Sequence, residues 1–183
     1  LAEALQARHG NEIMRVIFRG AALSHYLDQL PTTMLDEREV ITLHRVGREH
    51  LGEQVFAHVA RLAGQLTGDY ILANRIPAPA QRLLIWMPPW LAGRVLAKAI
   101  GAHAWTFVGS GEFSARSRPG GMFLTIKNSP LARETHADIP LCNYYSATFE
   151  RIFSRLVSPK TRVSEISCLA TGGKACCFDV AFR

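Results

Sequence analysis

The chain has 183 residues, of which 48% are hydrophobic and 20% are charged, a composition that suits one globular domain over residues 1–183 and excludes a disordered or low-complexity protein. The net charge of +6 arises from scattered lysines and arginines instead of a basic run, which argues against a nucleic-acid-binding protein. Four cysteines are too few for a disulfide scaffold, and no secretory signal segment is recognisable, so we expect a cytoplasmic protein.

The first half of the chain, about residues 10–100, is predicted to be helical. Apolar residues repeat at helical spacing from Ile13 to Ala21 and from Leu51 to Leu66, and Asp36 begins a capping-box pattern. Gly68 is predicted to end the helix that contains Leu66. Further short helices are expected over residues 69–75, 79–87 and 91–100.

The last of these helices belongs to the most apolar stretch of the chain, residues 83–100. This stretch is interrupted by Pro88, Pro89, Arg94 and Lys98, so it does not predict a membrane-spanning helix. Its spacing predicts one apolar face, opposite Arg94 and Lys98, which packs in the core or contacts a membrane surface or partner. The residues of that apolar face are Leu91, Val95, Leu96 and Ala99.

The second half, residues 101–183, has a different pattern. Strands are predicted from His103 to Val108 and from Met122 to Ile126, and a helix follows from about Pro140. Two more strands, 162–170 and 176–182, are predicted to form a terminal hairpin around two glycines. Helices followed by runs of strands, in place of strict alternation, predict an α+β fold.

Three cysteines and one glutamate are candidate metal ligands. Cys142 lies in the first turn of a predicted helix, where a thiol pKa is commonly lowered, and Cys168 and Cys176 flank the hairpin turn. Glu165 is three residues from Cys168, so the strand must bulge or end between them if both are to bind one ion. Buried free thiols, or a disulfide between Cys168 and Cys176, are the alternatives to a metal site.

The segment from Glu165 to Phe178 resembles the signature of the 4-vinyl-reductase domain family. Phenol-sensing regulators of that family hold zinc with the pattern Cys-x22-Glu-x2-Cys-x7-Cys, which Cys142, Glu165, Cys168 and Cys176 reproduce without a gap. The resemblance therefore implies a structural zinc ion with these four ligands. It leaves Cys177 out of the site, as a core residue on the other strand face.

Members of the family that act in bacteriochlorophyll biosynthesis are more similar still. The resemblance implies a fold like that of TRAPP subunits, a homodimer, and a location peripheral to the photosynthetic membrane at most. The segments that carry it span most of the chain: residues 43–51, 67–77, 103–107 and 143–151.

The implied ligand is a porphyrin intermediate of chlorophyll synthesis. Such a flat, mostly apolar ligand with carboxylates needs aromatic walls and a few basic or hydrogen-bonding groups. His103 could ligate a porphyrin magnesium, and Arg82, Arg94 and Arg118 could meet ligand carboxylates, although each is more commonly a surface residue. The candidate ligand-binding residues, most of which are equally explained as core aromatics, are Trp86, Trp90, His103, Trp105, Phe107, Phe123, Tyr144 and Tyr145.

Reduction of a vinyl group needs a hydride or electron donor, and no dinucleotide-binding fingerprint is recognisable in the sequence. A closed site of three thiolates and a carboxylate has no open position for catalysis. We therefore expect a tetrapyrrole-binding or carrier protein, for a magnesium-porphyrin or protochlorophyllide-type intermediate, which assists other enzymes of bacteriochlorophyll biosynthesis. The alternative is a divinyl (proto)chlorophyllide 8-vinyl (4-vinyl) reductase or an accessory subunit of one.

Overall fold

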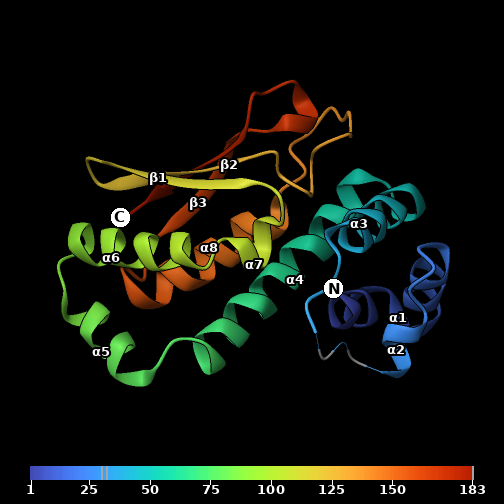
Figure 1. Ribbon diagram of the computed structural model, residues 1–183, viewed down its shortest axis with the longest axis horizontal. Helices are drawn as coiled ribbons and strands as arrows, with labels where there is room; N and C mark the ends of the chain where they lie inside the picture. Colours follow the sequence, from blue (N-terminus) through green and yellow to red (C-terminus); the bar gives the residue numbers. More distant parts are fainter. Residues whose placement is uncertain (30, 32, 183) are drawn as a thin grey trace.

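A computed structural model describes residues 1–29, 31 and 33–182. The predicted α+β fold is confirmed: helices fill the first half and an antiparallel sheet dominates the second (Figure 1). The helices are α1 (Ala2–Gly20), α2 (His25–Asp28), α3 (Glu37–Leu51), α4 (Glu53–Asn74), α5 (Ala78–Trp86), α6 (Pro89–Ala102), α7 (Trp105–Val108) and α8 (Asn143–Leu156). The strands are β1 (Glu112–Arg118), β2 (Gly121–Lys127), β3 (Arg162–Ser167) and β4 (Cys176–Ala181), with a 3-10 turn at Leu169–Thr171.

The sheet has the order β1-β2-β4-β3, and all its neighbouring strands are antiparallel. The predicted terminal hairpin is therefore confirmed as β3 and β4. Side chains alternate along β4, so that Cys176, Phe178 and Val180 are buried while Cys177 and Asp179 are not. The buried face of the sheet packs against α6, under β1 and β2, and against α8, under β3.

Helix α4 crosses the molecule from the N-terminal helices to α5 and packs along α8 (Figure 1). Close approach is possible because α4 has glycines where it meets α8. A Cβ on Gly64 would lie 2.2 Å from the carbonyl oxygen of Tyr144, and one on Gly68 would lie 2.6 Å from Cβ of Arg151. The prediction that Gly68 ends a helix is thus wrong: α4 continues through it to Asn74, because this glycine serves helix packing instead of a turn.

The strand predicted from His103 to Val108 is wrong. Residues Trp105–Val108 form the short helix α7, which ends at Gly109 with φ 55°. Aromatic and branched residues favour strands only where they can pack on a sheet, and here Phe107 packs against Tyr145 and Phe149 of α8. The edge strand β1 begins at Glu112; its side chains are mostly exposed, so it lacks the alternation that predicts a strand.

The apolar face predicted for α6 is rotated in the structure. Its buried residues are small or medium in size, because this side packs tightly on the sheet. A Cβ on Gly93, for example, would lie 2.6 Å from the ring of Phe182. Val95 is instead 42% exposed on the solvent side. The buried residues of α6 are Ala92, Gly93, Leu96 and Ala97.

The cap predicted for α3 is confirmed in part. The Asp36 side chain accepts a hydrogen bond from the backbone N–H of Arg38 at 2.8 Å, as a helix N-cap residue does. Glu39, the predicted partner in a capping box, accepts instead from the Tyr26 hydroxyl at 2.9 Å. Glu39 therefore ties α3 to α2.

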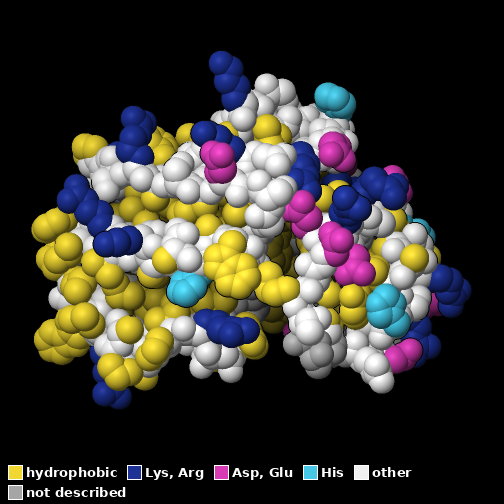
Figure 2. All heavy atoms as spheres, viewed as in Figure 1, with side chains coloured by type: hydrophobic (Ala, Val, Ile, Leu, Met, Phe, Trp, Pro, Cys, Tyr) yellow, Lys and Arg dark blue, Asp and Glu magenta, His cyan; other side chains and the backbone are white. Residues whose placement is uncertain are grey.

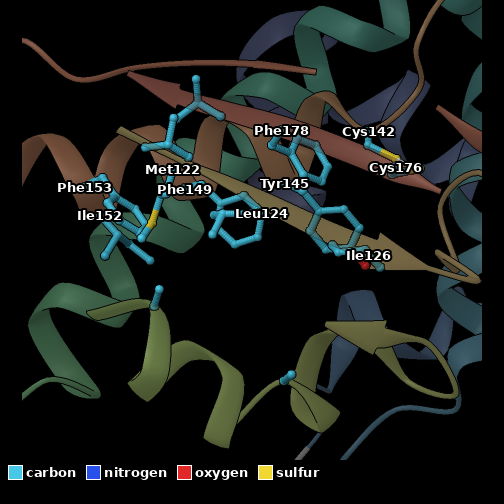
Figure 3. Close-up of a cluster of buried hydrophobic side chains, with 14 of the residues drawn as sticks. Met122, Leu124, Ile126, Cys142, Tyr145, Phe149, Ile152, Phe153, Cys176 and Phe178 are labelled. Carbon is cyan, nitrogen blue, oxygen red and sulfur yellow. Dashed lines mark hydrogen bonds between the residues drawn. The ribbon is translucent and has the colours of Figure 1, made fainter. Parts of the chain in front are cut away.

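Buried apolar residues form two clusters, one under the sheet and one among α1, α3 and α4. Tyr144 of α8 packs against both, so α8 is the element between them. Figure 3 shows the sheet-side cluster, with side chains of β2, β4 and α8 pointing into one interior. Among the described residues, no helix is long and apolar enough to cross a membrane.

The glycine contact between α4 and α8 gives a direct test of this packing. We expect Gly64→Ala to lower the free energy of unfolding by about 1–3 kcal/mol, because its Cβ would meet the backbone of α8. The matched control is Gly101→Ala, whose Cβ would meet the Phe113 ring at an ordinary 3.6 Å. Urea unfolding measures both variants, and equal effects would contradict this account of the interface.

Candidate functional site

The four candidate metal ligands converge at the point where α8 begins. Cys142 is the N-cap residue of α8, and Cys176 is the first residue of β4. Glu165 lies in β3, and the pairing of β3 with β4 shifts register between Glu165 and Ser167, which is the irregularity that the spacing required. This shift lets Glu165 and Cys168 reach the same side of the hairpin.

One ligand atom from each of these residues lies within 4.8 Å of all the others. We call Cys142, Glu165, Cys168 and Cys176 the thiol–carboxylate cluster. The Cys142 and Cys176 sulfurs are 3.2 Å apart, and those of Cys176 and Cys168 are 3.9 Å apart. A tetrahedral zinc site with Zn–S bonds of about 2.3 Å separates its sulfurs by about 3.7 Å, a value within this range.

The turn between β3 and β4 is built to bring the two hairpin thiols together. Gly172 adopts φ 85°, a left-handed conformation that other residues seldom take. Gly173 donates its backbone N–H to the Cys168 carbonyl at 2.8 Å, and a Cβ there would lie 2.7 Å from that same oxygen. The two glycines are therefore needed for the tight return of the chain from Cys168 to Cys176.

The surroundings of the cluster suit a bound cation. All three thiols are fully buried. Glu165 accepts a hydrogen bond from the backbone N–H of Cys142 through Oε2 at 2.9 Å, while its Oε1 is buried without a hydrogen-bond partner. A buried carboxylate oxygen without a partner is costly, and a metal ion would satisfy it. The cluster could therefore bind a metal.

Without a bound cation, the cluster disfavours the simultaneous deprotonation of its four ionisable groups. Hydrogen bonds to the Cys168 and Cys176 sulfurs, with burial, raise the pKa of Cys142 well above its usual value. The lowered pKa predicted for a helix N-terminal thiol is thus wrong for Cys142. It is the pKa of Cys168 that is strongly lowered, because this sulfur accepts hydrogen bonds from Cys142 and Cys176. Burial and the Cys168 thiolate raise the pKa of Glu165 to about 8.

Arg48 of α3 is a neighbour of the cluster that the sequence did not reveal. Its side chain is buried, and burial lowers its pKa, while attraction to the Cys142 thiolate acts in the opposite direction. When Cys142 is deprotonated, this buried guanidinium therefore balances part of its negative charge. No sequence signal marks Arg48, because it is distant from the four ligands in the chain.

The alternatives to a metal site can be compared with the geometry. All four cysteines are free thiols, so the predicted alternative of a disulfide between Cys168 and Cys176 does not occur. Cys177 lies outside the cluster on the other strand face, as predicted, with its sulfur 3.4 Å from the Thr125 hydroxyl. It is half-buried, however, so the prediction of a core position for Cys177 is wrong.

An aromatic cluster lies next to the thiol–carboxylate cluster. Figure 3 shows Cys142 and Cys176 side by side beyond Tyr145 and Phe178, at one end of the buried side chains. Most rings pack edge to face or tilted, and Tyr145 and Phe149 are stacked, with centroids between 5.4 and 6.4 Å apart. The Tyr145 hydroxyl donates to the Phe107 carbonyl at 2.7 Å. The members of this aromatic cluster are Phe107, Phe113, Tyr145, Phe149 and Phe178.

A groove of about 270 Å³ runs between α6 and β1, at the edge of the aromatic cluster. Phe113 belongs to both the groove and the cluster, and Met122 and Ala97 add apolar lining. Two cations, Arg94 and Lys98, line the groove from α6. Arg94 is oriented by its hydrogen bond to the Ser117 hydroxyl at 3.1 Å. The groove thus combines aromatic and aliphatic walls with positive charge.

Several predicted ligand-binding residues lie away from this groove. Trp86, Trp90 and Trp105 are 88%, 60% and 63% exposed, and none of them lines it. His103 is exposed at the end of α6. Phe123 faces the other side of the sheet, where Arg116 and Arg118 each lie 5.5 Å above its ring.

The two tyrosines that were predicted to bind the ligand lie in different surroundings. Tyr145 joins the aromatic cluster with Phe107, whereas Tyr144 turns to α4 and donates a hydrogen bond to the Thr67 hydroxyl at 3.0 Å. The sequence missed Phe113 and Lys98 as members of the groove. Phe113 was hidden because the strand that carries it was not predicted, and Lys98 was interpreted only as part of a solvated helix face.

Comparison with known sequences identifies similar proteins over most of the chain. Residues 122–182, which include all four ligands of the thiol–carboxylate cluster, match the 4-vinyl-reductase domain. The chain is 48% identical over 148 residues to the bacteriochlorophyll synthase 23 kDa chain of Cereibacter sphaeroides, covering 80% of this chain and 70% of that protein. It is 44% identical over 146 residues to the protein of the same name from Rhodobacter capsulatus, covering 79% and 67%.

Solved structures with this fold have little sequence identity to it. A structure from a study of heme distortion in the H-NOX family superposes with a TM-score of 0.61 at 13% identity, covering 100% of this chain and 90% of the other. The phenol-responsive sensory domain of the transcription activator PoxR, solved with phenol, superposes with a TM-score of 0.56 at 12% identity, covering 82% and 76%. The fold is therefore that of the H-NOX and 4-vinyl-reductase-domain proteins.

Metal binding at the thiol–carboxylate cluster should depend on pH with a defined sign. A metal takes deprotonated ligands, but the raised pKa values of Glu165 (about 8), Cys176 (about 12) and Cys142 keep these three groups protonated near neutral pH. We therefore expect affinity for Zn²⁺ to rise with pH and binding to release more than one proton. Titration calorimetry in buffers of different ionisation enthalpy measures this release, and an affinity independent of pH would contradict it.

Proposed function

The chain belongs to the family of the bacteriochlorophyll synthase 23 kDa chain, and from that membership we propose that it binds and carries a tetrapyrrole intermediate of bacteriochlorophyll synthesis. The H-NOX-like fold supports this proposal, because the most similar of the structures described above comes from a study of heme distortion. The carrier would hold the intermediate and pass it to the enzymes that modify it.

The groove between α6 and β1 is the observation that carries the proposal. A tetrapyrrole presents a flat apolar ring with carboxylates at its edge, so it needs aromatic walls on one side and cations on the other. Phe113 and Met122 offer the apolar wall, while Arg94 and Lys98 offer the cations. The groove is open to solvent and adjoins the aromatic cluster through Phe113, so movement of α6 away from the sheet would widen it.

Binding without reduction is the activity that the groove supports best. The side chains that line it are apolar, hydroxyl or basic, and none is a carboxyl, histidine or thiol that could exchange protons with a substrate at neutral pH. The three thiols of the thiol–carboxylate cluster are buried on the far side of the aromatic cluster. A vinyl reductase would instead need a bound donor of hydride or electrons beside the ligand.

We further propose that the thiol–carboxylate cluster holds a structural zinc ion. Three thiolates and one carboxylate fill the four positions of a tetrahedral site, and zinc prefers sulfur and oxygen donors in this geometry. The unpaired Oε1 of Glu165 and the sulfur separations support the assignment. With all four positions taken by protein, the ion would fasten β3 and β4 to the start of α8.

Titration with magnesium protoporphyrin tests the carrier. We expect a saturable shift of its Soret absorbance band with the purified chain. Reversal of two charges in the double variant Arg94→Glu with Lys98→Glu should weaken binding about tenfold, because two exposed ion pairs contribute about 0.5–1 kcal/mol each. The charge-matched control, Arg8→Glu with Arg45→Glu, changes exposed residues of α1 and α3 and should bind normally.

Two results would contradict the carrier. One is the absence of a Soret shift, or equal weakening by the control variant. The other is turnover: a divinyl substrate incubated with the chain and NADPH, flavin or reduced ferredoxin should remain unreduced, and clear reduction would favour the vinyl reductase.

Two cysteine variants of the same hairpin, one inside the cluster and one outside it, test the zinc proposal. Cys168→Ser removes one ligand and should lower the zinc content from about one ion per chain to a small fraction, with loss of stability in the hairpin. Cys177→Ser removes the half-buried thiol outside the cluster and should keep its zinc. Elemental analysis of the purified variants measures both, and full zinc in Cys168→Ser would refute the assignment.

A further inference from the structure

Large apolar side chains project into solvent where α5 meets α6. Their exposed fractions are 59% for Leu83, 58% for Ile85, 88% for Trp86, 60% for Trp90 and 42% for Val95. We call these five residues the elbow patch. Figure 2 shows hydrophobic side chains gathered over this end of the molecule, with lysine and arginine side chains among them.

The exposure of the elbow patch follows from how the two helices are anchored. Leu84 is the buried residue of α5, and at about 100° per residue Leu83, Ile85 and Trp86 occupy the arc opposite it. Helix α6 buries Ala92, Gly93, Leu96 and Ala97 against the sheet, which leaves Trp90 and Val95 outside. Pro88 and Pro89 fix the bend between the helices, so that both apolar arcs are held outward.

The charges in the chain segment that carries the elbow patch have one sign. From Tyr70 to Gly111 the chain has no aspartate or glutamate, whereas it has three arginines and one lysine in the same segment. The Arg94 guanidinium lies 5.5 Å from the centre of the Trp90 ring, so positive charge touches the apolar surface directly. These basic residues are Arg75, Arg82, Arg94 and Lys98, and all are exposed.

We propose that the elbow patch is a docking surface for the anionic face of a lipid bilayer. Tryptophan prefers the boundary between headgroups and acyl chains, and an apolar helix face bordered by lysine and arginine lies in that boundary. Anionic headgroups attract exposed basic residues, and the lack of acidic residues in the segment removes the opposing repulsion. The chain would rest on the membrane through α5 and α6.

A second copy of the chain fits this surface less well. A two-fold interface would place the elbow patch against itself, and would bring the basic residues of both copies together. Like charges facing each other at short range oppose such an association. An anionic surface meets the same residues with opposite charge. The charge pattern therefore favours lipid over a second copy.

Vesicle sedimentation tests the proposal. We expect the purified full chain to bind vesicles of phosphatidylcholine mixed with phosphatidylglycerol, and to bind phosphatidylcholine alone much more weakly. Trp86→Ser with Trp90→Ser should lower binding about tenfold or more, and Arg82→Glu should lower binding to the anionic vesicles alone by about tenfold. All three residues are exposed, so folding should be unchanged.

Matched controls use the opposite end of the molecule. Arg8→Glu makes the same charge change on α1 as Arg82→Glu, and Met34→Ser removes an apolar side chain that is 60% exposed, as Trp90 is. Both controls should bind vesicles normally. Failure of the wild-type chain to bind anionic vesicles, or normal binding by the Trp86→Ser, Trp90→Ser variant, would overturn the proposal. A third contradicting result would be a wild-type dimer, seen by sedimentation velocity, that vesicles do not affect but that the Trp86→Ser, Trp90→Ser variant does not form.

Discussion

Three buried sulfurs and one carboxylate meet where the start of α8 lies against the hairpin of β3 and β4. This arrangement places four ionisable groups within 4.8 Å of one another, and burial together with the Cys168 thiolate raises the pKa of Glu165 to about 8. With a cation, the same groups become a covalent-like link between segments far apart in sequence. Much else in the molecule takes its position from α8.

From that fixed start, α8 organises both halves of the chain. Its Tyr145 and Phe149 support the aromatic cluster beneath the sheet, and Tyr144 and Thr148 face α4, whose Gly64 carbonyl accepts a hydrogen bond from Thr148 at 3.1 Å. The sheet in turn supplies Phe113 and Met122 to the groove, and α6 supplies the cations. The outer side of α6 contributes to the elbow patch, so an apolar ligand in the groove would lie close to the surface proposed to meet lipid.

Much of this arrangement could be predicted from the sequence because its signals are local. Glycines between two strands predicted the terminal hairpin. The resemblance to the 4-vinyl-reductase domain pattern implied the set of four ligands, and the spacing of Glu165 and Cys168 indicated the bulge that the set needs. Features that depend on tertiary packing were not predictable. Gly68 looks like a helix stop unless α8 is known to lie against it, and the exposure of Trp86 follows only from which side of α5 is buried.

Hydrogen–deuterium exchange with and without a chelator tests the central role of the thiol–carboxylate cluster most directly. Removal of the metal should speed amide exchange in β3, β4 and the first turn of α8, then in the parts of the sheet that they support. The helix α1, which packs in the other core cluster, should change little. Unchanged protection of the hairpin after complete metal removal would contradict the account.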